Sequence, residues 1–340
     1  MTTSPALTAQ DRAHGALLGL ALGDALGMPT QSLPHARIAA LHGRVDRLLD
    51  APDDQPIAPG IPAGSITDDT EQALLLARLL LDGDGHVDPH DLAAALISWE
   101  QDMIARGSRD LLGPSTKAAL EKLQAGVPVE ETGRYGTTNG AAMRIAPVGI
   151  AIAPGRRLLD AVVEASQVTH LTGIGISGAA AIAGAVSAAL EGADTDEALD
   201  VALDLAKQGA SRGSWIAGAS IPARVRAFRA PLRGLDLTDR DEFLRDVVGT
   251  SVQSQESVVA ALLLVDLGRE DPFEALCTAA SLGGDTDTVA AMAGAVLGAL
   301  HGASAFPASM TAKVREVNGL DLEPLAEELL ALRRRTIARP

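Results

Sequence analysis

The chain has 340 residues, of which 47% are hydrophobic and only 2% are aromatic. This composition is typical of a globular protein whose core is built from Ala, Leu, Val and Ile, and such side chains favour close packing of helix on helix. The formal net charge of −16 argues against a broad surface for nucleic acid or anionic lipid, so we expect small-molecule partners, with no nucleic acid and no membrane.

Predicted helices follow one another along the chain. Apolar residues recur at spacings of three and four in the segments 66–82, 88–105, 116–126, 195–209, 254–268, 274–282 and 324–335. Only short β-branched stretches, such as MRIAPVGIAIA at 143–153, hint at extended structure, and there is no βαβ alternation and no fixed-period repeat. The sequence therefore predicts an all-α fold in one domain, residues 12–335.

The segment GIGISGAAAIAGAVSAAL at 173–190 reaches the lower edge of a membrane span. It consists mostly of Ala, Gly and Ser, which partition poorly into lipid, so we expect a buried helix. It also contains G-x-G-x-x-G, but no strand is predicted before it, and close helix packing explains these glycines better than a dinucleotide site.

Two further features indicate a cytoplasmic protein. The only cysteine, Cys277, lies in an apolar helical pattern and has no partner for an internal disulfide. The N-terminal stretch MTTSPALTAQDR has neither the basic start nor the apolar run of a secretory signal.

Two acidic clusters each precede an apolar helix: ITDDTE at 66–71 and GGDTDT at 283–288. Helix capping explains one carboxylate in each, for example in a capping box of Asp68 with Glu71. The second carboxylate of each cluster is not needed for capping. Carboxylates that lie close together repel each other unless a cation lies between them. All candidate ligands are oxygens, which indicates a hard ion such as Mg²⁺, Mn²⁺ or Ca²⁺ instead of structural zinc, with capping alone as the alternative.

Three further segments place polar side chains beside small residues: GALLGLALGDALGMPTQ at 15–31, TTNGAAMRIAPVG at 137–149 and THLTGIGISGAAAIAGAV at 169–186. A Gly-Asp pair inside an apolar helix is costly unless a backbone or a ligand must approach closely. Together with the two acidic clusters, in this order, these segments resemble the ADP-ribosylglycohydrolase family, whose members include the dinitrogenase reductase activating glycohydrolases. The resemblance implies a single orthogonal all-α domain whose central cleft holds two Mg²⁺ or Mn²⁺ ions.

The resemblance also implies site residues, by matching of motif positions. The first set of metal ligands is Thr67, Asp68 and Asp69, and the second set is Asp285, Asp287 and Thr288. The residues that line the substrate cleft are Asn139, Gly140, Met143 and His170.

Several of these residues have a second interpretation. Asp24 matches the family's first helix, where it would orient ligands or bound water, but it is also explained as a buried acceptor of backbone amides. His170 is alternatively a structural histidine or a local cap, and Arg144 holds either a scaffold carboxylate or a phosphate. Trp99 and Trp215 are expected to be packing residues, or else to cover a base or a nicotinamide ring.

The implied activity is metal-dependent hydrolysis of an ADP-ribosyl glycosidic bond, on a modified protein side chain or a small ADP-ribosyl compound. In such enzymes the ions hold ribose hydroxyls and orient a water toward the anomeric carbon. Two alternatives stay open: hydrolysis of a free nucleoside or other small N-riboside, and a family member that only binds its ligand.

Gln31 departs from the family pattern. Many members carry Glu at the end of a Gly-Asp-Ala-x-Gly-x-x-x-Glu segment, whereas GDALGMPTQ supplies an amide, which cannot take a proton from water at neutral pH. We therefore expect Asp68 or Asp287 to manage that proton, and Gln31 to position water or ribose.

Overall fold

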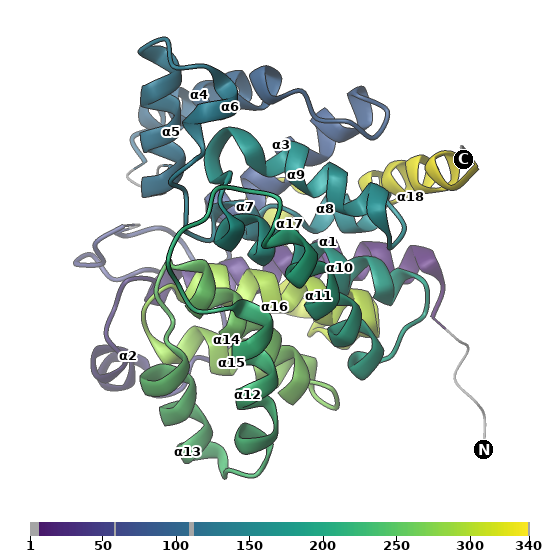
Figure 1. The fold of residues 1–340 in the computed structure, drawn as a ribbon. Coiled ribbons are helices and arrows are strands. Elements are labelled where there is room, and N and C mark those ends of the chain that lie inside the picture. The colour runs from purple at the N-terminus through teal and green to yellow at the C-terminus, as the bar shows by residue number, and fades with distance from the viewer. Residues whose placement is uncertain (1–6, 58, 109–111, 339–340) are drawn as a thin grey trace.

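The computed structural model describes residues 7–57, 59–108 and 112–338, and its regular structure is helical (Figure 1). Within these ranges there is no strand, only two isolated bridges, Thr138 with Gln253 and Thr172 with Ser214. The prediction of an all-α fold is confirmed. Residues 1–6, which carry part of the argument about a secretory signal, lie outside the described residues. The helical elements are α1 (Ala9–Gly27), η1 (Met28–Thr30), α2 (His35–His42), α3 (Asp68–Asp82), α4 (Pro89–Ala105), α5 (Pro114–Gln124), α6 (Val129–Thr132), α7 (Gly140–Met143), α8 (Ala146–Ala151), α9 (Arg156–His170), α10 (Gly173–Leu190), α11 (Thr195–Gly209), α12 (Ile221–Arg233), α13 (Leu237–Glu242), η2 (Phe243–Val248), α14 (Ser254–Leu267), α15 (Pro272–Leu282), α16 (Thr286–His301), η3 (Ala303–Ala305), α17 (Ala308–Asn318) and α18 (Leu322–Ala338).

The segment 143–153, which hinted at extended structure, is instead mostly helical. It contains the end of α7 and the whole of α8, and Pro147 lies in the first turn of α8, where its missing amide costs no helical hydrogen bond. Ile145, Val148 and Ile150 are fully buried. The β-branched residues of this segment therefore reflect burial on all sides and not a strand.

A stripe of glycines brings α1 and α16 into backbone contact at the centre of the molecule (Figure 1). A Cβ atom on Gly19 would lie 2.1 Å from the carbonyl oxygen of Gly294, and one on Gly23 would lie 2.1 Å from that of Ala290. At Gly27 the nearest atoms belong to the backbone of Thr286 and Asp287. The close approach predicted from the Gly-Asp segment is confirmed, and it sets the start of α16 against the end of α1.

α10 is the one helix among the described residues that is long and apolar enough to cross a membrane, and 94% of its span is buried in the protein. The prediction of a buried helix at 173–190 is confirmed. Its glycines serve packing: a Cβ on Gly175 would lie 3.0 Å from the Gly136 oxygen, and one on Gly178 would lie 3.2 Å from Val258. No strand precedes α10 in the described chain, so the dinucleotide interpretation does not apply.

The lone cysteine and the two tryptophans have different environments. Cys277 is buried in α15, as its apolar pattern indicates. Trp99 is buried on α4 and donates a hydrogen bond to Glu71, so the packing role expected for it is confirmed. Trp215 is 85% exposed, and the expectation that it is a packing residue is wrong. It follows α11 in a segment without regular structure, where no helical pattern fixes a buried face.

Candidate active site

Asp24 joins α1 to the start of α3. Its fully buried carboxylate accepts hydrogen bonds from the backbone amides of Thr67 at 3.0 Å and Thr70 at 3.1 Å, and from both threonine hydroxyls. Burial raises the pKa of Asp24 to about 6, while the hydrogen bonds from Thr70 and Thr67 act in the opposite direction. Asp24 is thus a buried acceptor of backbone amides, and through Thr67 it also holds a residue of the first predicted ligand set.

Asp69 and Thr288 bring the two acidic clusters together. Asp69 Oδ2 accepts hydrogen bonds from Thr67 Oγ1 at 3.2 Å and from Thr288 Oγ1 at 3.1 Å, so α3 and α16 meet at this carboxylate. The other oxygen, Oδ1, is buried without a hydrogen-bond partner. Burial, followed by the negative charges of Asp287 and Asp68, raises the pKa of Asp69 well above its ordinary value.

Capping does not use the carboxylates of the first cluster. The N-cap of α3 is Thr67, whose hydroxyl accepts a hydrogen bond from the Asp69 amide. The capping box of Asp68 with Glu71 is therefore not formed, and Glu71 instead accepts a hydrogen bond from Trp99. A hydroxyl is sufficient for the cap, so the acidic residues beside it need another explanation.

The turn before α16 is shaped by two glycines. Gly283 and Gly284 have φ values of 89° and 80°, and a Cβ on Gly284 would lie 2.5 Å from the Thr250 oxygen. Asp285 follows as the N-cap residue but makes no side-chain capping bond. Its Oδ2 accepts a hydrogen bond from Asn139 Nδ2 at 2.5 Å. Burial raises the pKa of Asp285 to about 6 against the effect of this hydrogen bond.

Most of the predicted site residues line one cavity of about 250 Å³. Those that do so are Gln31, Asp68, Asn139, Gly140, Met143, Asp285, Asp287 and Thr288. The wall is completed by Ser32, Ile57, Leu112, Gly113, Pro114, Thr116, Thr138 and Val252. Asp24, Thr67, Asp69 and His170 do not line the cavity. Asp69 and His170 hydrogen-bond to the lining residues Thr288 and Thr138, whereas Asp24 and Thr67 lie behind Asp69. A larger cavity of about 800 Å³ lies against α9 and shares no lining residue with this one.

His170 lies behind the cavity wall. Its Nε2 is 3.0 Å from Thr138 Oγ1 and its Nδ1 is 2.8 Å from Thr169 Oγ1. A Cβ on Gly140 would lie 3.0 Å from the His170 ring, so this glycine allows the ring to approach the wall. Burial lowers the pKa of His170 well below its ordinary value, and the ring is neutral at physiological pH. The structure thus places His170 in a supporting position and not in the direct contact that the motif suggested.

Arg144 matches neither of its two expected roles. The side chain is fully buried, hydrogen-bonds to the neutral side chains of Gln72 and Thr169, and does not line the cavity. Its guanidinium donates to Gln72 Oε1 at 3.2 Å and to Thr169 Oγ1 at 2.6 Å. Gln72 Nε2 in turn donates to Asp68 Oδ2 at 2.8 Å. Burial lowers the pKa of Arg144 to about 10, so the group remains a cation at neutral pH and acts on Asp68 through Gln72.

The donor chemistry of the two clusters fits a hard divalent cation. The unsatisfied Oδ1 of Asp69 is the kind of buried atom that a cation would pair. Among the described residues, however, no three Asp, Glu, His or Cys side chains are grouped closely enough to hold an ion by themselves. A bound ion would need hydroxyl or water oxygens as well, which Mg²⁺ accepts readily. The dinuclear centre therefore stays a prediction.

Some residues of the site were not singled out from the sequence. Gln72 lies one helical turn after Asp68, and that spacing is the signal by which it could have been found. Thr138 directly precedes Asn139 in the TTNG segment. The apolar wall residues Ile57, Leu112 and Val252 come from three different loops, and no sequence pattern connects them.

Comparison with known proteins identifies the class to which this fold and this site belong. The family model described as ADP-ribosylglycohydrolase matches residues 5–338. The chain belongs to the ADP-ribosylglycohydrolase family, as the order of its motifs indicated.

Two relatives and one solved structure show the extent of the similarity. The chain is 37% identical to YegU of Escherichia coli (strain K12), over 95% of this chain and 97% of that protein. It is 31% identical to ADP-ribosylarginine hydrolase Tri1 of Pseudomonas putida (strain GB-1), over 94% of this chain and 78% of that protein. It also matches the structure of an "ADP-ribosylglycohydrolase-related protein complex" with a TM-score of 0.66 and 29% identity, over 96% of this chain and 98% of that chain.

Proposed function

We propose that the chain is a hydrolase that depends on two Mg²⁺ or Mn²⁺ ions and cleaves an ADP-ribosyl glycosidic bond. The observation that carries this proposal is the convergence of the two acidic clusters at Asp69, one of whose buried oxygens has no partner. Uncompensated buried carboxylates are costly unless a cation neutralises them. The name of the relative Tri1, an ADP-ribosylarginine hydrolase, supports this substrate class.

The ions, when bound, would supply a template for the ribose hydroxyls and would acidify a water molecule. The ligands would be the carboxylates and hydroxyls of the two clusters, that is, Thr67, Asp68, Asp69, Asp285, Asp287 and Thr288. Asn139 donates to Asp285 and fixes its orientation. Gln72, held by Arg144, does the same for Asp68. Both carboxylates are thus oriented by hydrogen bonds from amide side chains, which is the preorganisation that catalysis requires.

Proton transfer falls to the carboxylates that line the cavity. Gln31 is buried against the same cavity, and its Nε2 has no hydrogen-bond partner. An amide donates a hydrogen bond but does not accept a proton from water at neutral pH. Asp68 or Asp287 therefore takes the proton of the attacking water, and Gln31 donates to the water or to a ribose hydroxyl. We expect a substrate whose leaving group needs little protonation.

Hydrolysis of a small N-riboside is the second candidate, because Ile57, Leu112 and Val252 supply an apolar wall of the kind that a base needs. Among the described residues that line the cavity there is no Arg, Lys or His. A diphosphate bound there would depend on backbone amides, for example near Gly113 or Gly140, whereas a nucleoside needs only an apolar wall for its base.

A product screen separates these activities. The purified chain is incubated with Mg²⁺ or Mn²⁺ and with ADP-ribosylated protein, small ADP-ribosyl compounds or nucleosides. We expect ADP-ribose release that is abolished by EDTA and by Asp287→Asn but retained in the exposed control Asp46→Asn. Release of a base from nucleosides alone would establish the second candidate. Absence of any product, with ligand binding retained, would identify a binding protein.

A further inference from the structure

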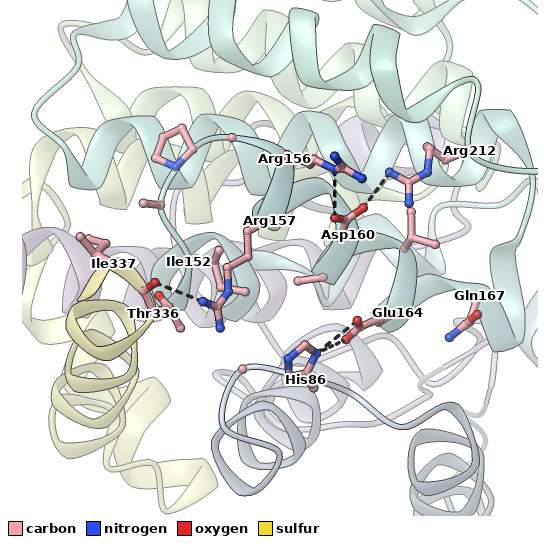
Figure 2. A pocket seen from close by; sticks show the side chains of 16 residues that line it. His86, Ile152, Arg156, Arg157, Asp160, Glu164, Gln167, Arg212, Thr336 and Ile337 are labelled. Carbon is pink, nitrogen blue, oxygen red and sulfur yellow. Dashed lines mark hydrogen bonds and ion pairs between the residues drawn. The ribbon is translucent and has the colours of Figure 1, made fainter. Parts of the chain in front are cut away.

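The cavity beside α9 and the candidate active-site cavity differ in how far their polar side chains are paired. Beside α9, Asp160 pairs with Arg212 at 2.8 Å, and Glu164 pairs with His86 at 3.2 Å (Figure 2). In the candidate active site, the side-chain nitrogen of Gln31 is buried without a hydrogen-bond partner. A buried donor that is left unpaired is unfavourable, so other contacts must hold Gln31 in this position.

Gln31 lies in a tight turn with a strained residue at its third position. The Leu33 amide donates to the Thr30 carbonyl oxygen at 3.1 Å, and Gln31 has φ −56° and ψ 139°. Ser32 follows with φ 61°, in the left-handed region. These angles are typical of a type II turn, in which the third position is usually Gly or Asn. A serine there is strained, and we expect contacts that keep the turn in this form.

The central peptide of this turn, between Gln31 and Ser32, is held from both sides. Its N–H, that of Ser32, donates to the carbonyl oxygen of Gly284, directly before Asp285, at 2.6 Å. Its carbonyl oxygen, that of Gln31, accepts from Gln55 Nε2 at 3.2 Å. Rotation of this peptide to the orientation of a type I turn, which serine adopts more readily, would break both hydrogen bonds. The strained turn therefore depends on Gly284 and on Gln55.

Gln55 lies in the loop between α2 and α3, and its side chain is directed inward. It is 2% exposed, whereas its neighbour Asp54 is exposed. Its Nε2 also donates to the Met28 carbonyl oxygen at 3.2 Å, and its Oε1 accepts from the Ile57 amide at 2.6 Å. The bond to Ile57 fixes the side-chain amide so that its nitrogen faces Met28 and Gln31. Burial of a glutamine is costly unless its polar groups are paired, and these three bonds pair them.

We propose that Gln55 is a positioning residue of the candidate active site, which holds the type II turn and thereby keeps the side-chain amide of Gln31 in the cavity. The proposal rests on the proposed function, in which Gln31 donates to the attacking water or to a ribose hydroxyl. Gln55 itself does not line the cavity and acts through Gln31. Loss of Gln55 should therefore weaken binding of the ribosyl group although no group that contacts the ligand is removed.

The experiment is isothermal titration of the full chain with ADP-ribose in the presence of Mg²⁺. The test variants are Gln55→Met, which fills a similar space without a donor, and Gln55→Glu, which keeps the acceptor for the Ile57 amide but, when ionised, has no donor. The control is Asn318→Ala. Asn318 holds the far end of the same loop, at Gly64 and Ile66, and none of its hydrogen-bond partners lines the cavity. We expect both test variants to bind ADP-ribose at least about threefold more weakly than the parent, and the control to bind like the parent.

Two double variants show whether Gln55 acts through the turn and through Gln31. In the Gln31→Ala background, Gln55→Met should change the ADP-ribose affinity by less than about twofold, because the group that Gln55 positions is already absent. Addition of Ser32→Gly to Gln55→Met should restore part of the lost affinity, because glycine adopts a positive φ without strain. A residue that only stabilised the loop would weaken binding equally in both backgrounds, and Ser32→Gly would not restore affinity.

Hydrogen exchange tests the proposal without a ligand. Amide exchange in the segment 28–33 should be faster in both Gln55 variants than in the parent, and unchanged in Asn318→Ala. Unchanged exchange in both Gln55 variants, additive effects of Gln55→Met and Gln31→Ala, or parent-like ADP-ribose affinity in both Gln55 variants would each overturn the proposal. If the parent bound no ADP-ribose, the proposed hydrolase would be contradicted, and the exchange measurement would still decide whether Gln55 holds the turn.

Discussion

Thr288 on α16 donates a hydrogen bond of 3.1 Å to Asp69 on α3, although the two residues lie 219 positions apart in the chain. Both helices are placed by α1, which carries Asp24 at the start of α3 and glycines against α16. The arrangement of the acidic clusters is therefore a consequence of helix packing. Changes in that packing should alter the site even where no site residue is replaced.

Gly23→Ala tests this dependence. The added Cβ would lie 2.1 Å from the Ala290 oxygen, and two helix backbones must separate to accept it. We expect a loss of about 3 kcal/mol in the free energy of unfolding, measured by urea denaturation. In the control Gly234→Ala the nearest atom to the new Cβ lies at 3.4 Å, and its stability should remain within about 0.5 kcal/mol of the parent. Equal stability of the two variants would contradict backbone contact between α1 and α16.

Divalent metal should raise the melting temperature of the parent protein, because an ion that binds only the folded state stabilises it. Asp287→Asn removes one charge of the second cluster, and we expect its Mg²⁺ or Mn²⁺ affinity to fall at least about tenfold by calorimetry, since the amide is a weaker ligand for a hard cation. Asp46→Asn is the matched exposed control. Unchanged affinity in Asp287→Asn, or one melting temperature with and without saturating metal, would argue against the two-cluster metal site.

Asn139→Ala should affect both substrate and metal. The side chain lines the cavity and also donates to Asp285 at 2.5 Å, so its loss frees a predicted ligand to rotate. We expect a higher KM together with metal affinity weaker by about tenfold, the usual effect of removing a group that orients a ligand. Met143 lines the same cavity and makes no hydrogen bond to a carboxylate. Met143→Ala should therefore raise KM without weakening metal binding. Identical metal affinity in all three proteins would show that Asn139 does not orient Asp285.

The pH dependence of stability offers a test in the metal-free protein. The pKa of Asp285 is raised from 3.8 to about 6 in the folded state. Between these pH values the folded protein binds more protons than the unfolded chain, so the contribution of Asp285 to stability is lost as the pH rises through about 6. In Asp285→Asn this loss is absent. We therefore expect the melting temperature of the variant, relative to the parent, to increase from about pH 4 to about pH 7, whereas a constant difference would contradict the raised pKa.

The sequence was informative where the cause of a structural feature lies within a single segment. The helices were predicted from the spacing of apolar residues. The glycines of α1 predicted a close backbone approach, because glycine destabilises a helix and is therefore expected where two backbones must come close. The acidic clusters were recognised as exceeding their capping need, and the structure shows that the cap of α3 is a hydroxyl while Asp285 makes no capping bond.

The sequence was uninformative where the answer depends on which helices face each other. Whether His170 reaches the cavity or lies behind Thr138 depends on how α9 packs against α7, and neither segment contains that information. Arg144 was expected to bind a carboxylate or a phosphate, but its partners Gln72 and Thr169 are neutral and come from two other helices. Trp215 was expected to be a packing residue because of its residue type alone, and it is exposed.

The most direct test of the proposed hydrolase compares the parent, Gln31→Ala and Gln31→Glu on ADP-ribosyl and nucleoside substrates with saturating Mg²⁺ or Mn²⁺. If Asp68 or Asp287 takes the proton and Gln31 only positions water or ribose, the parent turns over at least one ADP-ribosyl substrate. Gln31→Ala should then lose about 10²-fold or less in kcat, the range of one positioning hydrogen bond. If the parent is inert on every substrate while Gln31→Glu hydrolyses an ADP-ribosyl bond, the parent is a ligand-binding protein and the assignment of a hydrolase is wrong.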